Sequence, residues 1–168
     1  LNVDSAIRNS LTLERTPDGI NTIFFADELG SVYAVDATSG ALRWKVSVKV
    51  HPTSIVSGSV AYSPENGGTL LVPISLYEVM VAANPKHECC RARGGLTALN
   101  AQTGEKRWHF ATTPPAEKTY LNAAGTQMWG PSGVAVWNRP TVDAARGVVY
   151  FGTGENASSP ATEMSDSI

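Results

Sequence analysis

The sequence lacks several features that would identify particular classes of protein. No run approaches the ~20 consecutive apolar residues of a membrane-spanning helix, and Leu1–Ser10 has neither the basic start nor the apolar core of a signal peptide. No cluster of Lys and Arg offsets the net charge of −2, so we expect no nucleic-acid partner. Glycine-rich phosphate loops, Cys-x-x-Cys pairs and Cys-x-x-Cys-His haem sites are also absent.

Helical periodicity is missing as well, because no stretch longer than about two turns has helical spacing. With 42% apolar and 17% charged residues, the composition is that of a globular protein rather than a disordered or fibrous chain. Short bursts rich in Val, Ile, Tyr and Phe alternate with turn signals such as Pro17-Asp18-Gly19. We therefore predict an all-β chain. Its clearest predicted strands are Asn21–Phe25, Ser31–Val35, Thr69–Ile74, Gly133–Trp137 and Gly147–Phe151.

One strand–turn–strand unit occurs twice in the sequence. Residues 32–44 (VYAVDATSGALRW) align without gaps with residues 96–108 (LTALNAQTGEKRW), at an offset of 64 residues (108 minus 44). Repetition of such a unit at an interval of tens of residues is typical of a β-propeller, in which each sheet buries its faces against neighbouring sheets. We therefore predict part of a propeller rather than two unrelated hairpins.

Each copy of this unit has the residues that a tight hairpin requires. Asp36 or Asn100 ends the first strand, and its side chain can accept a hydrogen bond from a backbone N–H two residues on. Gly40 or Gly104 supplies the positive φ of the turn. The second strand ends in a tryptophan, which we expect to pack between neighbouring units.

The number of repeats is too small for a closed propeller. Two tryptophan-bearing hairpins amount to two to three blades, whereas propellers typically close with about 4–8. A third copy of the unit would start at the last residues, Ser165–Ile168. We therefore expect residues 1–168 to be an incomplete propeller domain of a longer protein, with sheet edges that other blades cover. A complete small β domain is the alternative.

The only two cysteines, Cys89 and Cys90, are adjacent. Cα atoms joined by a trans peptide lie about 3.8 Å apart, less than the usual ~4.4–6.8 Å of a disulfide, so a bridge would strain the intervening peptide. Such a bridge closes no loop and gains little loop-closure stabilisation. If oxidised, the pair forms a rigid apolar surface suited to a planar ligand. If reduced, it is simply two neighbouring thiols.

Three features together resemble the dehydrogenases that depend on pyrroloquinoline quinone (PQQ) and oxidise alcohols. These are the Ala-x-Asp/Asn-x-x-x-Gly-x-x-x-Trp repeats, the pair Cys89-Cys90 followed by Arg93-Gly94, and the stretch Gly152-Thr-Gly-Glu-Asn156. The Glu88-Cys-Cys segment and residues 127–137 (QMWGPSGVAVW) are most similar to the polyvinyl-alcohol dehydrogenase branch. The resemblance runs from about Phe24 to the end. It implies a quinoprotein propeller of eight blades, two to three of which lie in this chain.

The resemblance also implies which residues contact the cofactor. Cys89 and Cys90 would form a disulfide on one face of the PQQ ring, and Trp137 would stack on the other face. Arg93 would pair with a PQQ carboxylate, since its guanidinium is planar and always charged. Further candidates for polar contacts to the cofactor are Glu78 and Ser132.

Members of this family bind calcium, a hard cation that takes oxygen ligands, and Asn156 matches the family's amide ligand. Glu155 stands where many relatives have asparagine directly after glycine, so it could replace or supplement that ligand. The alternative for Asn156 is an ordinary turn residue. The catalytic aspartate is expected beyond Ile168, so we assign no catalytic base and expect the isolated chain to be inactive.

The function implied by the resemblance is oxidation of an alcohol with PQQ and calcium, with a cytochrome c or a membrane quinone as electron acceptor. Because a vicinal disulfide persists in an oxidising compartment, and because the resemblance implies a family that acts in the bacterial periplasm, we expect the periplasm. A membrane-bound sugar dehydrogenase of the same quinoprotein type would differ in substrate and anchoring. The alternative from another class is a non-catalytic propeller with the same repeat, acting as a scaffold in outer-membrane assembly. Such a scaffold has no use for the cysteine pair.

Overall fold

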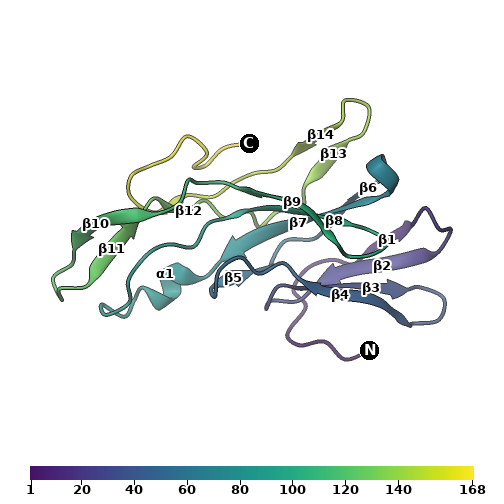
Figure 1. The fold of residues 1–168 in the computed structure, drawn as a ribbon, viewed down its shortest axis with the longest axis horizontal. Coiled ribbons are helices and arrows are strands. Elements are labelled where there is room, and N and C mark those ends of the chain that lie inside the picture. Colours follow the sequence, from purple (N-terminus) through teal and green to yellow (C-terminus); the bar gives the residue numbers. More distant parts are fainter.

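The computed structural model describes residues 1–168 and consists almost entirely of antiparallel β-sheet (Figure 1). Its first sheet has four strands in sequence order, β1-β2-β3-β4, the arrangement of a propeller blade. In the second sheet, β7 pairs with β8 on one side and with the short β5 and β6 on the other, and β9 follows β8. The strands are β1 (Thr12–Arg15), β2 (Asn21–Ala26), β3 (Ser31–Asp36), β4 (Leu42–Ser47), β5 (Ser54–Ile55), β6 (Ala61–Ser63), β7 (Thr69–Leu76), β8 (Gly95–Asn100) and β9 (Lys106–Ala111).

The chain after β9 forms three two-stranded sheets. In these, β10 pairs with β11, β13 with β14, and β12 with the more distant β15. The strands are β10 (Glu117–Leu121), β11 (Gln127–Gly130), β12 (Ser132–Gly133), β13 (Thr141–Asp143), β14 (Val148–Tyr150) and β15 (Asn156–Ser158). The two helical segments are the 3-10 turn η1 (Glu65–Gly67) and α1 (Glu78–Val81). No helix here has the length and apolar character needed to span a bilayer. The all-β prediction is confirmed.

Both copies of the repeated unit fold into the hairpins that the sequence predicts, β3–β4 and β8–β9. The Asp36 carboxylate accepts hydrogen bonds from the backbone N–H groups two and three residues on, both at 2.8 Å. The Asn100 side chain accepts the corresponding pair at 2.8 and 3.3 Å. Gly40 and Gly104 have φ values of 73° and 76°, which side chains with a Cβ atom rarely adopt. Local turn chemistry therefore sets the geometry of both hairpins.

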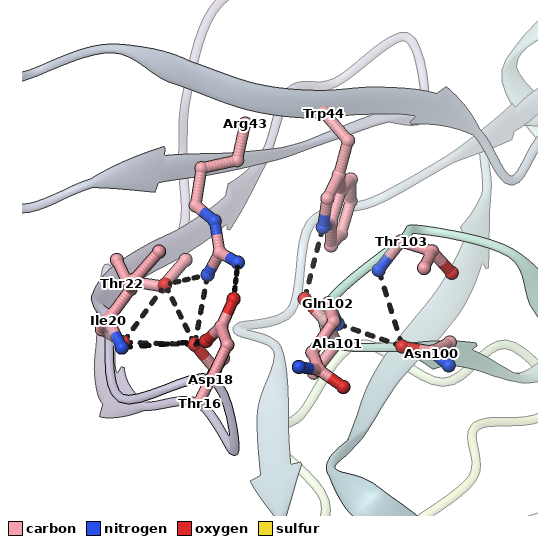
Figure 2. Close-up of polar contacts among 10 residues, drawn as sticks. All are labelled: Thr16, Asp18, Ile20, Thr22, Arg43, Trp44, Asn100, Ala101, Gln102 and Thr103. Carbon is pink, nitrogen blue, oxygen red and sulfur yellow. Dashed lines mark hydrogen bonds and ion pairs between the residues drawn. The ribbon is translucent and has the colours of Figure 1, made fainter.

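Trp44 joins the two blades. Its indole Nε1 donates to the Ala101 carbonyl in the turn of the second hairpin, at 3.0 Å (Figure 2). A Cβ atom on Gly104 would lie 2.8 Å from the indole ring, so this position also needs glycine for close packing. The ring is 9% exposed and belongs to a core of 13 buried residues drawn from both sheets. The predicted packing of this tryptophan between units is confirmed.

The arginine beside each tryptophan ties its hairpin to the strands before it. Arg43 forms an ion pair with Asp18 and donates to the Thr22 hydroxyl, and it also donates to Thr16 Oγ1 at 2.9 Å (Figure 2). Arg107 bonds in the same way to the start of β7 and to the η1 turn, at 2.5 and 2.7 Å. The repeat thus preserves a contact within each blade as well as the contact between blades.

Trp108 occupies the position of Trp44 in the second copy but makes no comparable contact. Its side chain is 45% exposed, and the neighbouring Phe110 is 43% exposed. Together with Val149 and Phe151 they border an apolar groove of about 600 Å³ between β9 and the β14 region. On this face of the second blade Trp108 and Phe110 therefore stay half-exposed, while Leu96 and Ala98 opposite them are buried against Val142, Val149 and Phe151.

The predicted strand Gly133–Trp137 is wrong beyond its first residue, because β12 ends at Gly133. Val134 has a φ of 52°, which takes the chain out of the extended conformation. The N–H groups of Val134 and Val136 then bond to two different segments, the loop before β15 and strand β7, at 2.8 and 3.0 Å. Trp137 consequently lies on a loop. The other four predicted strands coincide with β2, β3, β7 and β14.

Candidate functional site

Cys89 and Cys90 form a disulfide, and no free cysteine remains. The peptide bond between them is cis, with a Cα–Cα distance of 3.0 Å, so the trans geometry used in the sequence prediction does not hold. Both side chains are buried, Cys90 completely. Of the two alternatives that the sequence left open, the structure contains the oxidised pair.

The disulfide is fixed to strand β11 by two backbone hydrogen bonds. The Cys90 N–H donates to the Trp129 carbonyl at 3.1 Å, and the Trp129 N–H donates to the Cys89 carbonyl at 2.7 Å. Strand β11 belongs to the β10–β11 hairpin, which extends from one end of the molecule (Figure 1). Cys89, Tyr120, Met128 and Trp129 border a cavity of about 240 Å³ beneath this hairpin. Cys89 of the disulfide therefore lines this cavity.

A second cavity, of about 310 Å³, gathers four of the predicted site residues: Glu78, Trp137, Glu155 and Asn156. The Trp137 indole is 51% exposed and lies against Gly154, where a Cβ atom would collide with the ring. The Gly154 N–H is bonded to the segment just before Trp137, at 2.9 Å. Glycine is thus required beneath the indole, which gives a physical reason for the second glycine of the Gly-Thr-Gly sequence in this loop.

The disulfide and Trp137 border neighbouring cavities rather than a single one. Ala157 of β15 lines both cavities, so this strand lies between them. The structure brings the two predicted cofactor walls to adjacent cavities, but within residues 1–168 they do not enclose one slot.

Arg93 lines neither cavity and lies beside the end of β9 instead. Its backbone forms a parallel bridge with Gly133, and its Nη1 donates to the Thr113 carbonyl at 3.1 Å. The Thr113 hydroxyl is buried and has no hydrogen-bond partner. An unsatisfied buried polar group costs about 1–3 kcal/mol, so its presence requires a reason such as a bound group. The Arg93 guanidinium is the group at this end of β9 that can pair with an anionic oxygen.

Near the end of β9 the positive charge comes from Arg93 and not from the nearby His109. Burial lowers the pKa of His109, and the positive charges of Arg93 and Lys106 lower this pKa further. The His109 ring is hydrogen-bonded through Nδ1 to the Thr97 hydroxyl at 2.9 Å. Because a lowered pKa keeps the imidazole neutral near pH 7, Arg93 carries the positive charge available to a ligand.

Glu78 and Ser132 are engaged in bonds within the protein. The Glu78 carboxylate is 3% exposed and accepts backbone N–H groups of Arg91 and Ala92, at distances of 2.6 to 3.1 Å. The Ser132 hydroxyl is fully buried and shares a hydrogen bond of 2.7 Å with the Ser158 hydroxyl. In this structure both side chains hold together segments that border the two cavities.

The residues expected to bind calcium do not assemble a cation site. Asn156 Oδ1 accepts the backbone N–H and the hydroxyl of Thr162, at 2.8 and 3.1 Å. Its Nδ2 donates to the Ser132 carbonyl at 3.2 Å, and Glu155 is exposed. No group of three or more His, Cys, Asp or Glu side chains is placed to hold a metal. Calcium takes about 6–8 oxygen ligands, so within residues 1–168 these two residues supply at most part of a site, and Asn156 has the bonding of a turn residue.

Taken singly, several of these groups have the chemistry that a flat, carboxylated quinone requires, although they do not share one cavity within residues 1–168. The Arg93 guanidinium and the unsatisfied Thr113 hydroxyl are suited to a carboxylate. The half-exposed Trp137 indole offers a plane on which a conjugated ring can stack, and the disulfide offers a compact apolar surface. Sequence reasoning missed Thr113. Nothing in the local sequence marks its hydroxyl as buried and unpaired.

Comparison with known proteins agrees with this chemistry. The profile of the family described as "PQQ: Glucose/ethanol/alcohol dehydrogenase, beta-propeller domain" matches residues 69–161. The chain is 38% identical to a polyvinylalcohol dehydrogenase of Sphingopyxis sp. (strain 113P3), over 98% of this chain and 25% of that protein. It is 36% identical to a polyvinylalcohol dehydrogenase of a Pseudomonas species, over 98% of this chain and 26% of that protein. Residues 1–168 thus span about a quarter of the length of these relatives.

A solved structure gives the same fold. The quinohemoprotein alcohol dehydrogenase ADHIIG from Pseudomonas putida HK5 superposes with a TM-score of 0.57 at 20% identity, over 80% of this chain and 20% of that one. At this identity the likeness concerns the fold alone, which is that of part of a propeller. The repeated hairpins, the vicinal disulfide and the family match over residues 69–161 lead to one conclusion: this chain belongs to the β-propeller family of PQQ-dependent glucose, ethanol and alcohol dehydrogenases.

Proposed function

We propose that the protein is a PQQ-dependent alcohol dehydrogenase of the polyvinyl alcohol dehydrogenase type. In this proposal residues 1–168 form an incomplete propeller domain that contributes part of the cofactor wall. The observation that carries the proposal is the buried Cys89–Cys90 disulfide. Arg93 follows four residues after Cys89. The similarity to two polyvinylalcohol dehydrogenases over 98% of this chain supports the substrate class.

Each group of this chain has a separate task in the proposed site. Bound PQQ supplies a quinone that accepts two electrons from the alcohol carbon. Arg93 binds a carboxylate through charge-assisted hydrogen bonds, and the Thr113 hydroxyl gains the partner that it otherwise lacks. The disulfide and the Trp137 indole provide apolar surfaces that exclude water from the ring. Calcium is part of the proposal for the complete protein only, since Asn156 and Glu155 would supply no more than part of its ligands.

We further propose a periplasmic location and a cytochrome c or a membrane quinone as electron acceptor. A disulfide between adjacent cysteines is maintained in an oxidising compartment, which supports the location. Two weaker relatives are named "Alcohol dehydrogenase (quinone), dehydrogenase subunit" and "Lupanine 17-hydroxylase [cytochrome c]", and these names support the two kinds of acceptor. We also propose that the catalytic base of the complete protein is an aspartate beyond Ile168.

The proposed function is tested by alcohol-dependent reduction of a dye by the complete protein, with and without PQQ. We expect turnover of polymeric secondary alcohols that requires PQQ, and no turnover by the isolated 168-residue chain, because it spans only about a quarter of the length of its relatives. Absence of PQQ-dependent turnover across polymeric, small primary and small secondary alcohols would contradict the proposal and favour a cofactor-free scaffold. Turnover by the isolated chain would contradict the prediction that the base lies beyond Ile168.

A further inference from the structure

Glu78 places a buried carboxylate directly against the segment that carries the disulfide. It is the first residue of α1 and is 3% exposed. Its Oε2 accepts the backbone N–H groups of Arg91 and Ala92, at 2.9 and 2.6 Å. Its Oε1 accepts the same Arg91 N–H at 3.1 Å and lies 3.3 Å from His87 Nε2. The two backbone N–H groups thus bond both oxygens and compensate for the burial of the carboxylate.

The two N–H groups held by Glu78 belong to the residues immediately after the disulfide. On the other side of the disulfide, the backbone partner is Trp129 of β11, and the Ala92 carbonyl accepts the Gly133 N–H at 2.9 Å. Main-chain groups thus bond the carbonyls of Cys89 and Ala92 and the N–H of Cys90, whereas the N–H groups of Arg91 and Ala92 are held by Glu78. Glu78 supplies the only side-chain hydrogen bonds to this backbone.

The Arg91 side chain does not take part in this arrangement. Its guanidinium pairs with the exposed Glu88 and stacks on the Trp129 ring, with 4.1 Å from its Cζ to the ring centroid. Glu78 thus makes no ion pair with it, although an arginine is its immediate neighbour. The Glu78 carboxylate therefore binds the backbone of Arg91 and Ala92 and not the charged side chain of Arg91.

We propose that Glu78 is a positioning residue that fixes the disulfide segment, and with it Arg93, for binding the cofactor. This inference rests on the proposed function for the identity of the cofactor, but its effect on the disulfide is independent of that function. Glu78 borders the 310 Å³ cavity, yet its oxygens are already bonded within the protein, so it acts through residues 89–92 rather than by touching a ligand.

The test is Glu78→Gln in the complete protein, with the disulfide reduced by dithiothreitol in the absence of PQQ. Glutamine has nearly the same shape, but it loses the charge and one acceptor oxygen. Because the sulfurs are buried, reduction requires local opening of the segment. We expect reduction about tenfold faster or more, from the loss of charge-assisted hydrogen bonds. In a protein that binds PQQ, we also expect a Kd about tenfold higher.

Glu88→Gln is the matched control. Glu88 lies next to the disulfide and bonds to the side chains of Arg91 and Trp129, but it makes no hydrogen bond to the backbone of residues 89–92. We expect its reduction rate to stay within about twofold of wild type. If Glu78→Gln does not fold, Glu78→Asp keeps the charge and withdraws it by one methylene, and it should show a smaller acceleration.

The outcomes separate this inference from the proposed function. A reduction rate in the folded Glu78 variant equal to that of wild type and Glu88→Gln would overturn the positioning role. An unchanged PQQ affinity in that variant, where wild type binds PQQ, would overturn it as well. If wild type binds no PQQ, the proposed function fails, and the reduction rates alone still decide whether Glu78 holds the segment.

Discussion

Replacing Trp44 with alanine in the 168-residue chain is expected to lower the free energy of unfolding by about 3–5 kcal/mol, the usual cost of removing a buried Trp side chain. The Trp44 ring is 9% exposed and packs within a core of 13 residues that spans both blades. Its removal also leaves the Ala101 carbonyl without the indole N–H that it accepts at 3.0 Å. The cavity and the unpaired carbonyl arise at the same junction, so both weaken the contact between the two blades.

The repeat supplies its own control. Trp108→Ala removes the same side chain from the equivalent position of the second unit, where the indole is 45% exposed and caps no neighbouring turn. We expect a loss below about 1 kcal/mol in the same chain. Urea unfolding followed by far-UV circular dichroism measures both variants without relying on tryptophan fluorescence. Equal losses for the two variants would show that Trp44 does not join the blades.

Replacing Arg93 with methionine in the complete protein is expected to raise the Kd for PQQ about 100-fold. Charge-assisted hydrogen bonds contribute about 1.5–3 kcal/mol, and each 1.4 kcal/mol corresponds to about tenfold in affinity. Methionine retains much of the side-chain length but removes the charge and every donor. The measurement is a PQQ titration followed by absorbance, with Arg146→Met as the control. Arg146 is an exposed arginine that pairs with Asp143, so its replacement should leave the affinity unchanged.

Thr113→Val is the companion variant, because valine has nearly the shape of threonine without its hydroxyl. The hydroxyl is buried and unsatisfied, so the variant without PQQ should be at least as stable as wild type. We expect PQQ affinity to fall about tenfold at the same time. A gain in stability together with a loss of affinity is hard to reconcile with a structural role. Wild-type affinity in both the Arg93 and Thr113 variants would exclude this corner from the cofactor site.

The parts of the fold that the sequence predicts well are those set by local interactions. The Asp36 and Asn100 turns, with Gly40 and Gly104, are fixed by groups within four residues of each other, so the motif specifies them completely. The hydrogen bond from Trp44 joins residues that are 57 positions apart, but the repeat itself predicted a contact of this tryptophan with a neighbouring unit. The vicinal pair was likewise visible in the sequence, although its oxidation was not decided by composition.

The parts that the sequence does not predict depend on contacts between distant segments. The extended course expected for Gly133–Trp137 is replaced by a loop because Val134 and Val136 bond to segments on either side of them. Glu78 reaches the backbone of Arg91, 13 residues away, and nothing in its local sequence indicates this. Thr113 is a candidate site residue only because its hydroxyl is buried and unpaired. Such properties follow from packing, which a single sequence does not reveal.

Titration of the complete apo-protein with PQQ, followed by the absorbance of the quinone, tests most directly whether the vicinal disulfide forms part of a cofactor wall. We expect saturable binding of one PQQ per protein, and markedly weaker binding when Cys89 and Cys90 are both replaced by alanine. Failure of the wild-type protein to bind PQQ, or equal affinity in wild type and the double variant, would contradict this role for the disulfide.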